Sequence, residues 1–443
     1  MINFRSVRAF VLIGALLAGL ALVPDSSGQT NTENFAQFEF NFNNPGARAT
    51  GVGGAFISIA DDATAAEANP AGLTKLIRPE LSAEVKWVQF TREVNNFSHV
   101  GTAANFQMVS RDFENSVVIP SFVSVVVPFG QLVGSLFRYE LANFKTTYYT
   151  KGAYVPPAQP SDMGDGWFFF PVSSDLTMKV VNWGGALSFK FSRYFSLGGS
   201  FGLSQLSMTS RLSRYYLEVF DPGNIANEAT IDADDNSFFF NAGVLVRPMK
   251  DLSIGAIFKY RPQFKVPHDF LFTRFPSDTV VRKEINFNVP SSIGIGVSYN
   301  PLDVLTLSFD VVRVAYSDLT EDFVITLDST YVTPADYKVD DAFEFHLGAE
   351  YVLLTRAVGF VFRAGFYTEA DNKIRFAGDP LQAADANGLF ARRAQAALFQ
   401  EGEMDYHYTF GVGFLISNNF QLDVAGNLSS GSDEVVASFV VRM

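Results

Sequence analysis

Charged side chains recur at the middle of otherwise apolar stretches in the second half of this sequence. Such groups can transfer protons, bind a charged ligand or neutralise one another when buried. Arg363 with Glu350 or Glu344 is the preferred pair, which predicts a structural network of Glu344, Glu350 and Arg363. Contact between one of these residues and a ligand is the alternative. The residues that share one face are Lys259, Arg261, Asp310, Glu344, Glu350, Arg363, Asp405 and His407.

Other kinds of chemistry lack their residues. The chain has no cysteine, and its four histidines are scattered without metal-ligand spacing. There is no glycine-rich phosphate loop and no Gly-x-Ser-x-Gly motif, and no nucleophile motif accompanies Asp405 and His407. A net charge of −13 disfavours nucleic acid as a partner. We therefore expect no enzyme, no metal and no cofactor.

The apolar stretches alternate with period two, which is the pattern of a β-strand with two different faces. Residues 284–299 show it most clearly. The apolar residues are predicted to share one face along the whole stretch, and they are Ile285, Phe287, Val289, Ile293, Ile295, Val297 and Tyr299. This segment is therefore predicted to be one strand with an oily face and a wet face.

The spacing of turns predicts a barrel. Short connections alternate with longer polar segments, roughly 92–115, 150–173, 217–236, 266–281, 317–340 and 370–402. Tight periplasmic turns and long external loops are typical of bacterial outer-membrane barrels. The predicted strands are 81–91, 116–128, 131–149, 174–191, 195–216, 237–248, 251–265, 282–299, 303–316, 341–354, 357–369, 403–416, 419–430 and 433–442. The fold class is thus an all-β, 14-stranded antiparallel transmembrane barrel.

One face of these strands suits lipid, because aromatic and aliphatic residues dominate it, as at Phe343, Phe345, Leu347 and Tyr351. A charge that faces lipid at mid-depth costs about 2–4 kcal/mol. The mid-strand charges are therefore expected to point into the lumen. A helix is also predicted outside the membrane, within 387–400, from its spacing of apolar residues.

The N-terminus is predicted to be a cleaved signal peptide over residues 1–28. Arg5 and Arg8 precede an apolar stretch of 15 residues, Ala9 to Val23, and small residues follow. A membrane anchor is the alternative, but the stretch is shorter than the ~20 residues of a spanning helix. No comparable apolar stretch follows, so we expect no helical membrane spans.

Residues 29–78 do not alternate like lipid-facing strands. They contain the turn Asn43-Asn44-Pro45-Gly46, a glycine-rich stretch and a short alanine-rich helix that ends before Pro70. About 50 residues are too few to form a core alone. We therefore predict that 29–78 form an N-terminal hatch that plugs the lumen, while 79–443 form the transmembrane barrel.

The hatch resembles that of a known family. The stretches 47–56 (ARATGVGGAF), 60–64 (ADDAT) and 69–73 (NPAGL) are similar to the hatch of the FadL-like outer-membrane transporters of long-chain fatty acids and toluene. Segments of the barrel, such as 347–351 (LGAEY), 363–366 (RAGF) and 411–414 (GVGF), also resemble this family. The resemblance covers nearly the whole mature chain.

The resemblance implies a transport route. Substrate would enter at the external loops, bind in the lumen near the hatch and leave sideways at a kink in the third strand, against which Asn69, Pro70 and Ala71 would lie. The hatch motif comprises Asp61, Asp62, Asn69, Pro70, Ala71 and Gly72. Candidate ligand-binding residues are Phe35, Phe38, Phe40, and the cations Arg138 and Lys259 for a carboxylate head.

The predicted function is passive transport of hydrophobic small molecules across the bacterial outer membrane, by a monomer whose partners are its substrate and membrane lipid. The main alternative is a FadL-like barrel that serves as a shuttle or anchor in type IX secretion without transport. The sequence does not identify the substrate.

Overall fold

A computed structural model describes residues 43–99, 106–150, 154–155, 167–168, 172–215, 225–272, 279–324, 331–356, 358–383, 385–417 and 419–443. Fourteen antiparallel strands pair in a closed ring among these residues, which confirms the predicted fold class. Around the ring they are β1 (Glu80–His99), β2 (Phe106–Phe129), β3 (Leu132–Thr150), β6 (Val172–Lys190), β7 (Phe195–Tyr215), β8 (Ile225–Met249), β9 (Leu252–Tyr260), β12 (Ser292–Leu302), β13 (Leu305–Val314), β15 (Ala342–Leu354), β16 (Gly359–Glu369), β18 (Asp405–Leu415), β19 (Phe420–Leu428) and β20 (Ser432–Arg442).

Two of the predicted strands are each split in the structure. Residues 251–265 become β9 and β10 (Gln263–Phe272), and 282–299 become β11 (Thr279–Asn288) and β12. Pro262 and Pro290 lie at the two interruptions, where a proline lacks the amide needed for the ladder. β10 and β11 extend the wall beyond β9 and β12, and β10 pairs with both β8 and β11.

The prediction of a single oily face over residues 284–299 was wrong. Ile285 and Phe287 on β11 are buried on the lumen side, whereas Ile293 and Ile295 on β12 are 51% and 62% exposed on the outer side. The interruption at Pro290 changes which side the odd-numbered residues face. Unbroken alternation in the sequence hid this reversal.

Several predicted external loops are strand instead. β1 continues to His99, β2 begins at Phe106, and β8 begins at Ile225. These ends are polar because they extend beyond the apolar band, and a polar composition alone predicts a loop. The predicted external helix is confirmed as α4 (Ala386–Leu398), and a 3₁₀ helix η3 (Tyr316–Thr320) follows β13.

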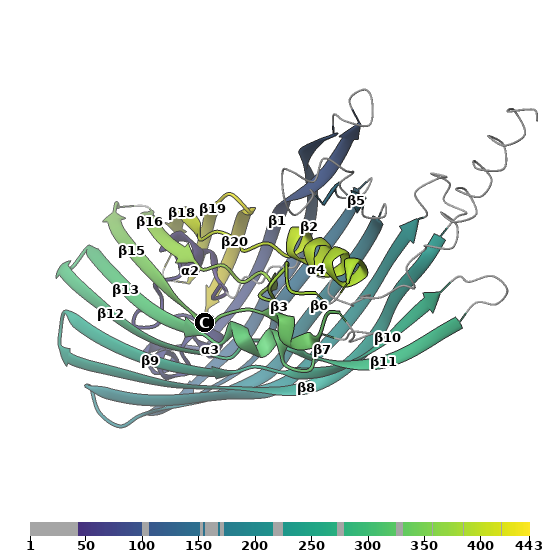
Figure 1. Ribbon diagram of the computed structural model, residues 1–443. Helices are drawn as coiled ribbons and strands as arrows, with labels where there is room; N and C mark the ends of the chain where they lie inside the picture. The colour runs from purple at the N-terminus through teal and green to yellow at the C-terminus, as the bar shows by residue number, and fades with distance from the viewer. Residues whose placement is uncertain are drawn as a thin grey trace, which may run out of the picture.

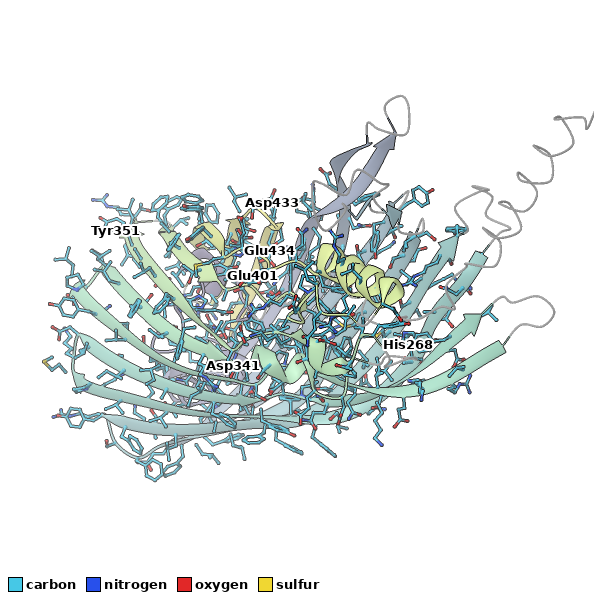
Figure 2. All side chains as sticks on the ribbon, in the orientation of Figure 1. His268, Asp341, Tyr351, Glu401, Asp433 and Glu434 are labelled. Carbon is cyan, nitrogen blue, oxygen red and sulfur yellow. The ribbon has the colours of Figure 1, made fainter. Side chains whose placement is uncertain are left out.

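The outer wall carries an apolar band near the short turns. On β7 the outward side chains are Leu197, Phe201 and Leu203, followed by Gln205 and Ser207. Figure 2 shows Tyr351 at the short-turn end of the barrel and His268 towards the opposite end. Among the described residues, the helices are all too short or too polar to span a membrane.

Residues 43–79, hereafter the lumen segment, lie inside the ring (Figure 1). The segment contains α2 (Ala47–Gly51), α3 (Ala65–Ala68) and the 3₁₀ helix η2 (Pro70–Lys75). α2 contacts β16, β18, β19 and β20, whereas η2 contacts β3, β6, β7 and β8 on another arc of the ring. The segment therefore bridges the lumen from wall to wall.

Candidate functional site

A chain of buried ion pairs joins the lumen segment to the wall. Arg48 contacts Glu350 through two hydrogen bonds, of 2.8 and 3.0 Å. Glu350 also accepts a bond of 2.7 Å from Arg363, whose other nitrogen lies 2.7 Å from Asp423. Glu350 and Arg363 face each other directly across β15 and β16. The carboxylate of Glu350 thus accepts hydrogen bonds from both the wall and the lumen segment.

Glu344 does not belong to this series of ion pairs. Its carboxylate accepts a hydrogen bond of 2.6 Å from Tyr316 and lies 3.6 Å from His346. The ring of His346 in turn contacts the carbonyl oxygen of Gly53 at 2.8 Å. The predicted lumen network therefore divides into two clusters, and both reach the lumen segment or its surroundings.

A second anchor centres on Glu67, which the sequence analysis did not single out. Its side chain is fully buried and lies 2.9 Å from Arg261 and 3.6 Å from Lys259. Asn241 donates a further hydrogen bond of 3.0 Å to this carboxylate. The signal in the sequence is a single acidic residue among the alanines of helix α3, because a charge in an apolar helix needs a partner when it is buried.

The Asn69-Pro70-Ala71 motif is held by β6 and β8. The Asn69 amide donates to the carbonyls of Ile57 at 2.8 Å and Val244 at 3.2 Å, and its oxygen caps η2 by accepting from Ala71. The Pro70 carbonyl accepts from the Ser188 hydroxyl. The 3₁₀ helix that contains Pro70 and Ala71 also contacts β3, the expected third strand, although the hydrogen bonds of the motif to the wall run to β6 and β8.

Asp61 and Asp62 anchor the segment internally. Arg48 pairs with Asp61, and Asp62 accepts a bond of 2.9 Å from the Thr64 amide. Burial alone would raise the pKa of Asp61, but the charges of Arg48 and Lys75 hold it below its ordinary value. Burial also lowers the pKa of Lys75 to about 8, against the opposing effect of Asp61. Gly72 packs so closely on the Ala60 carbonyl that a Cβ there would overlap it.

Glycines in the wall make room for the lumen segment, which gives a test of its docking. Gly198 faces inward, and an added Cβ would overlap the backbone of Pro70 and Ala71. We expect Gly198→Ala to weaken docking by about 1–3 kcal/mol, as overpacking does elsewhere. Amide hydrogen exchange in residues 43–79 should then be faster in the variant.

The neighbouring Gly199 supplies the matched control. It faces outward, and its added Cβ would approach nothing closer than 3.6 Å, the distance to the Asn241 carbonyl oxygen. Gly199→Ala should leave the exchange of the lumen segment unchanged. Equal exchange in both variants would show that the inner glycine is not a docking contact.

Above the lumen segment the inner wall changes from polar to apolar. Near the segment, β6, β7 and β8 present Ser188, Ser200 and Asn241 to the lumen. Further from the short turns, the inward side chains are apolar and join one hydrophobic cluster, whose wall members include Leu176, Met178, Leu206, Met208, Ile231, Phe264, Val266 and Phe287. The outer side of the same stretch is polar, as at Lys179 and Lys265. The external half of the lumen is thus built to receive apolar groups.

The external mouth is partly covered. In η3 and just beyond it, the carbonyls of Asp318 and Glu321 accept hydrogen bonds from Asn288, at the end of β11. α4 is tied to this cover through the short strand β14 (Tyr337–Lys338), which contacts η3. Gln395 of α4 accepts a bond of 2.7 Å from Tyr337, and Arg392 lies 2.9 Å from Asp336. Figure 1 shows α4 across the mouth of the barrel.

The wall is broken between β2 and β3. These strands have 24 and 19 residues, but they pair only from Phe122 with Tyr139 to Phe129 with Leu132. Beyond Tyr139, β3 pairs with β6 alone, and beyond Phe122, β2 pairs with β1 alone. The described backbone therefore has an interruption on the external side of these two residues.

A β-bulge on each strand lies at the break. On β3 the pairing with β6 shifts between Glu140 and Ala142, so Leu141 is an extra residue. On β2 the pairing with β1 shifts between Ile119 and Phe122, next to Pro120. A bulge bends the strand and interrupts the ladder. The bulge on β3 also accounts for the lack of a regular polar side on this strand, since Tyr139, Leu141 and Phe144 are all buried.

Aromatic and apolar residues surround the inner side of the break. Phe90 of β1 and Phe144 of β3 meet edge to face with ring centroids 5.5 Å apart. Phe122 lies 6.4 Å from Tyr139 on the opposite strand. This arrangement continues the apolar external lumen to the interruption in the wall.

The two predicted cationic ligand residues occupy different environments. Arg138 lies at the break, where it donates to the Pro120 carbonyl and pairs with Glu140, which Lys179 approaches to 3.6 Å. Lys259 donates to Asn44 at 2.9 Å and pairs with Glu67, so its charge is already used by the lumen segment. Phe35, Phe38 and Phe40 lie outside the described residues.

An outer apolar band, a closed antiparallel barrel and a lumen occupied by the chain's own N-terminal part define an outer-membrane β-barrel protein. Over residues 26–373 the sequence matches the family described as outer membrane protein transport protein (OMPP1/FadL/TodX), and the chain belongs to this family. The resemblance found in the sequence is thereby confirmed, as is the location in the outer membrane. The members of this family are transporters of hydrophobic compounds rather than enzymes.

Solved structures share the fold. The crystal structure of a Pseudomonas aeruginosa FadL homologue has a TM-score of 0.60 and 14% identity, and the match covers 89% of this chain and 97% of that one. The toluene transporter TodX of P. putida has a TM-score of 0.61 and 12% identity, and the match covers 91% of this chain and 99% of that one. The Ralstonia pickettii toluene transporter TbuX has a TM-score of 0.57 and 14% identity, and the match covers 91% of this chain and 99% of that one. Among curated proteins, none matches this sequence.

Proposed function

We propose that this protein carries hydrophobic small molecules, either long-chain fatty acids or aromatic hydrocarbons, passively through its lumen and releases them sideways between β2 and β3. The observation that carries this proposal is the apolar inner wall of the external lumen, which runs to the interruption beyond Phe122 and Tyr139. An apolar lining removes the solute from water, and a sideways exit avoids returning it to water. The lumen segment plugs the direct path to the periplasm.

The position of the break fits release into the membrane. The outward face of β3 is apolar up to Leu136 and becomes charged at Arg138, beside the last pair of the β2–β3 ladder. The break therefore opens near the external boundary of the apolar band. Arg138 and Lys179 share a single acid there, Glu140, and this excess of positive charge suits a departing carboxylate.

A secretion role has less support. A component that binds secreted proteins is expected to expose a broad apolar patch on its external side. In the described part of the external wall, the outward residues of β10 and β11 include Lys265 and Glu284, with side chains 72% and 61% exposed. Polar outward residues of this kind suit water or lipid head groups.

The proposal is tested by uptake of radiolabelled oleate and toluene in cells that lack their own transporter. Cells that carry this protein should accumulate one or both faster than cells with an empty vector. Deletion of residues 29–73 should alter uptake and make the barrel leaky while it still inserts. An inserted wild-type barrel that raises uptake of neither compound would overturn the proposal.

A further inference from the structure

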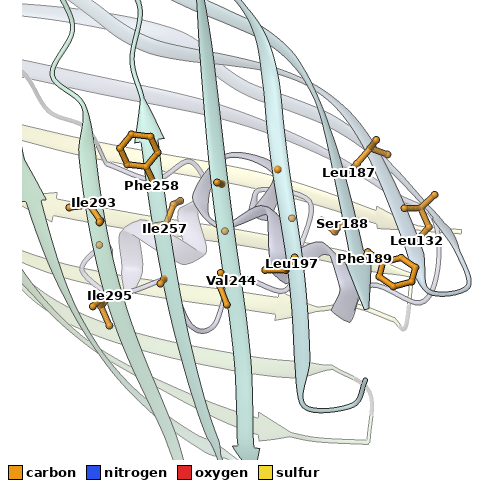
Figure 3. A pocket seen from close by; sticks show the side chains of 16 residues that line it. Leu132, Leu187, Ser188, Phe189, Leu197, Val244, Ile257, Phe258, Ile293 and Ile295 are labelled. Carbon is orange, nitrogen blue, oxygen red and sulfur yellow. The ribbon is translucent and has the colours of Figure 1, made fainter. Parts of the chain in front are cut away.

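The outer face of the barrel carries a groove that transport does not use. It has a volume of about 630 Å³ and lies over β6, β7, β8, β9 and β12, within the range of roughly 300–1,000 Å³ seen for small-molecule sites. Its floor is low because the outward residues there are small, namely Gly199, Ala242 and Ala256. Its sides are formed by Leu187, Phe189, Leu197, Phe258, Ile293 and Ile295. Figure 3 looks through this wall with the lumen segment behind it.

The groove faces hydrocarbon. The side chains around it belong to the exposed apolar band, as shown by Leu187 at 62% and Ile295 at 62% exposure. Ser188 is the one polar side chain of the lining, and it points inward to the Pro70 carbonyl. An unfilled hollow in this setting would lose dispersion contacts on one side. A flexible acyl chain can follow the hollow and restore them.

The short-turn end of the groove has a rim suited to a lipid head group. The ring centroids of Phe189 and Phe191 lie 4.7 Å apart, and those of Phe191 and Phe195 lie 5.6 Å apart. Beside them, the Arg193 guanidinium stacks on Tyr194, 4.5 Å from the ring centre. Aromatic residues favour the membrane–water boundary, so this end of the groove lies at the height of the head groups.

Positive charge at this rim is not neutralised by the protein. Among the described residues, Arg193 forms no ion pair with an acid, and its guanidinium contacts Tyr194 instead. Short turns face the periplasm in outer-membrane barrels, and the lipids of the periplasmic leaflet are phospholipids. Cations at the surface of a leaflet attract anionic lipids. The charge and the apolar hollow therefore match the two parts of one molecule.

We propose that the groove is a specific site for an anionic phospholipid of the periplasmic leaflet. One acyl chain lies over Gly199, Ala242 and Ala256, and the phosphate group lies near Arg193. A second copy of this chain is a poorer match, because it would bring Arg193 of one copy close to Arg193 of the other. This site is separate from the transport route, which lies inside the barrel and at the β2–β3 break.

The test is native mass spectrometry of the folded, full-length barrel after exchange into nanodiscs of mixed phosphatidylethanolamine and phosphatidylglycerol. The wild type should retain about one phospholipid, with phosphatidylglycerol preferred roughly tenfold. Gly199→Leu with Ala242→Leu fills the groove, and the added Cβ of Gly199 meets nothing closer than 3.6 Å. This variant should lose the retained lipid roughly tenfold or more.

Two further variants separate the parts of the site. Gly185→Leu is the matched control, because it adds an outward leucine on β6 outside the groove and its Cβ meets nothing closer than 3.5 Å. It should retain lipid like the wild type. Arg193→Gln should keep a bound lipid but lose the preference for phosphatidylglycerol.

Heat-dependent gel mobility verifies that each variant is folded. Equal lipid retention by the wild type and the groove-filled variant would overturn the site. A wild type that retains no lipid, or a dimer cross-linked through this face, would also overturn it. The result does not depend on transport, so it stands or falls separately from the proposed function.

Discussion

Replacement of Glu67 by glutamine should release the lumen segment and make the barrel leaky. Glu67 is buried between Arg261 and Lys259, which would be left without their common counter-ion. Removing one partner of a buried ion pair typically costs about 3–5 kcal/mol. The cost falls on docking of the segment, because Glu67 belongs to α3 and not to the wall. Faster amide exchange in residues 43–79 and entry of polar antibiotics are the measurements.

A surface pair provides the control for this variant. Glu284 lies 3.5 Å from Lys265, and both side chains are mostly exposed. Exposed pairs contribute roughly 0–1 kcal/mol, so Glu284→Gln should change neither exchange nor leakage. If Glu67→Gln behaved like Glu284→Gln in a folded barrel, the carboxylate would not be an anchor of the segment.

Deletion of Leu141 should close the proposed sideways exit. Leu141 is the extra residue between Glu140, opposite Val181, and Ala142, opposite Val180. Without it, the β3–β6 ladder becomes continuous, and the bend that separates β3 from β2 is lost. Uptake of oleate by cells should fall roughly tenfold or more, because the bulge is what interrupts the ladder.

The control for the deletion keeps the bulge. Leu141→Ala shortens the side chain without changing the number of residues on β3, so uptake should stay within a small factor of the wild type. An inserted barrel that lacks Leu141 and transports as fast as the wild type would place the exit elsewhere.

The sequence predicted the barrel well where lipid contact imposes a strict pattern. From β12 to β20 the alternation of apolar and polar residues located each strand of the ring, because a charge facing hydrocarbon is costly. The same rule failed for β10 and β11. These strands extend beyond the apolar band on the external side, where the outward side chains are polar and the inward ones apolar. The alternation there has the same period of two, so the sequence does not show which side faces outward.

The candidate site was harder to predict because it depends on single-residue irregularities. A proline such as Pro120 indicates an irregular point in a strand, but its position at the break follows only from the pairing of β2 with its neighbours. An extra residue such as Leu141 disturbs the alternation without showing which neighbouring strand is lost. Glu67 and Lys259 are 192 positions apart in the chain, and no local pattern reveals that they meet in the lumen.

The placement of the Asn69-Pro70-Ala71 motif shows what a resemblance can transfer. The 3₁₀ helix that contains Pro70 and Ala71 contacts the expected third strand, but the hydrogen bonds of the motif to the wall run to β6 and β8. Inward glycines such as Gly198 and Gly243 are what allow this close approach. A resemblance in sequence therefore identifies the motif, whereas its closest contacts depend on which strands of the wall carry small residues.

Photo-cross-linking with a diazirine-bearing fatty acid tests the sideways route most directly. The cysteine-free wild-type barrel is illuminated in membranes during uptake, and the labelled peptides are identified by mass spectrometry. We expect labels along the apolar external lumen and at the break, in residues 117–122 and 139–144. Labels that instead pass the lumen segment and gather at the short-turn mouth, around Leu354 and Leu415, would contradict release between β2 and β3.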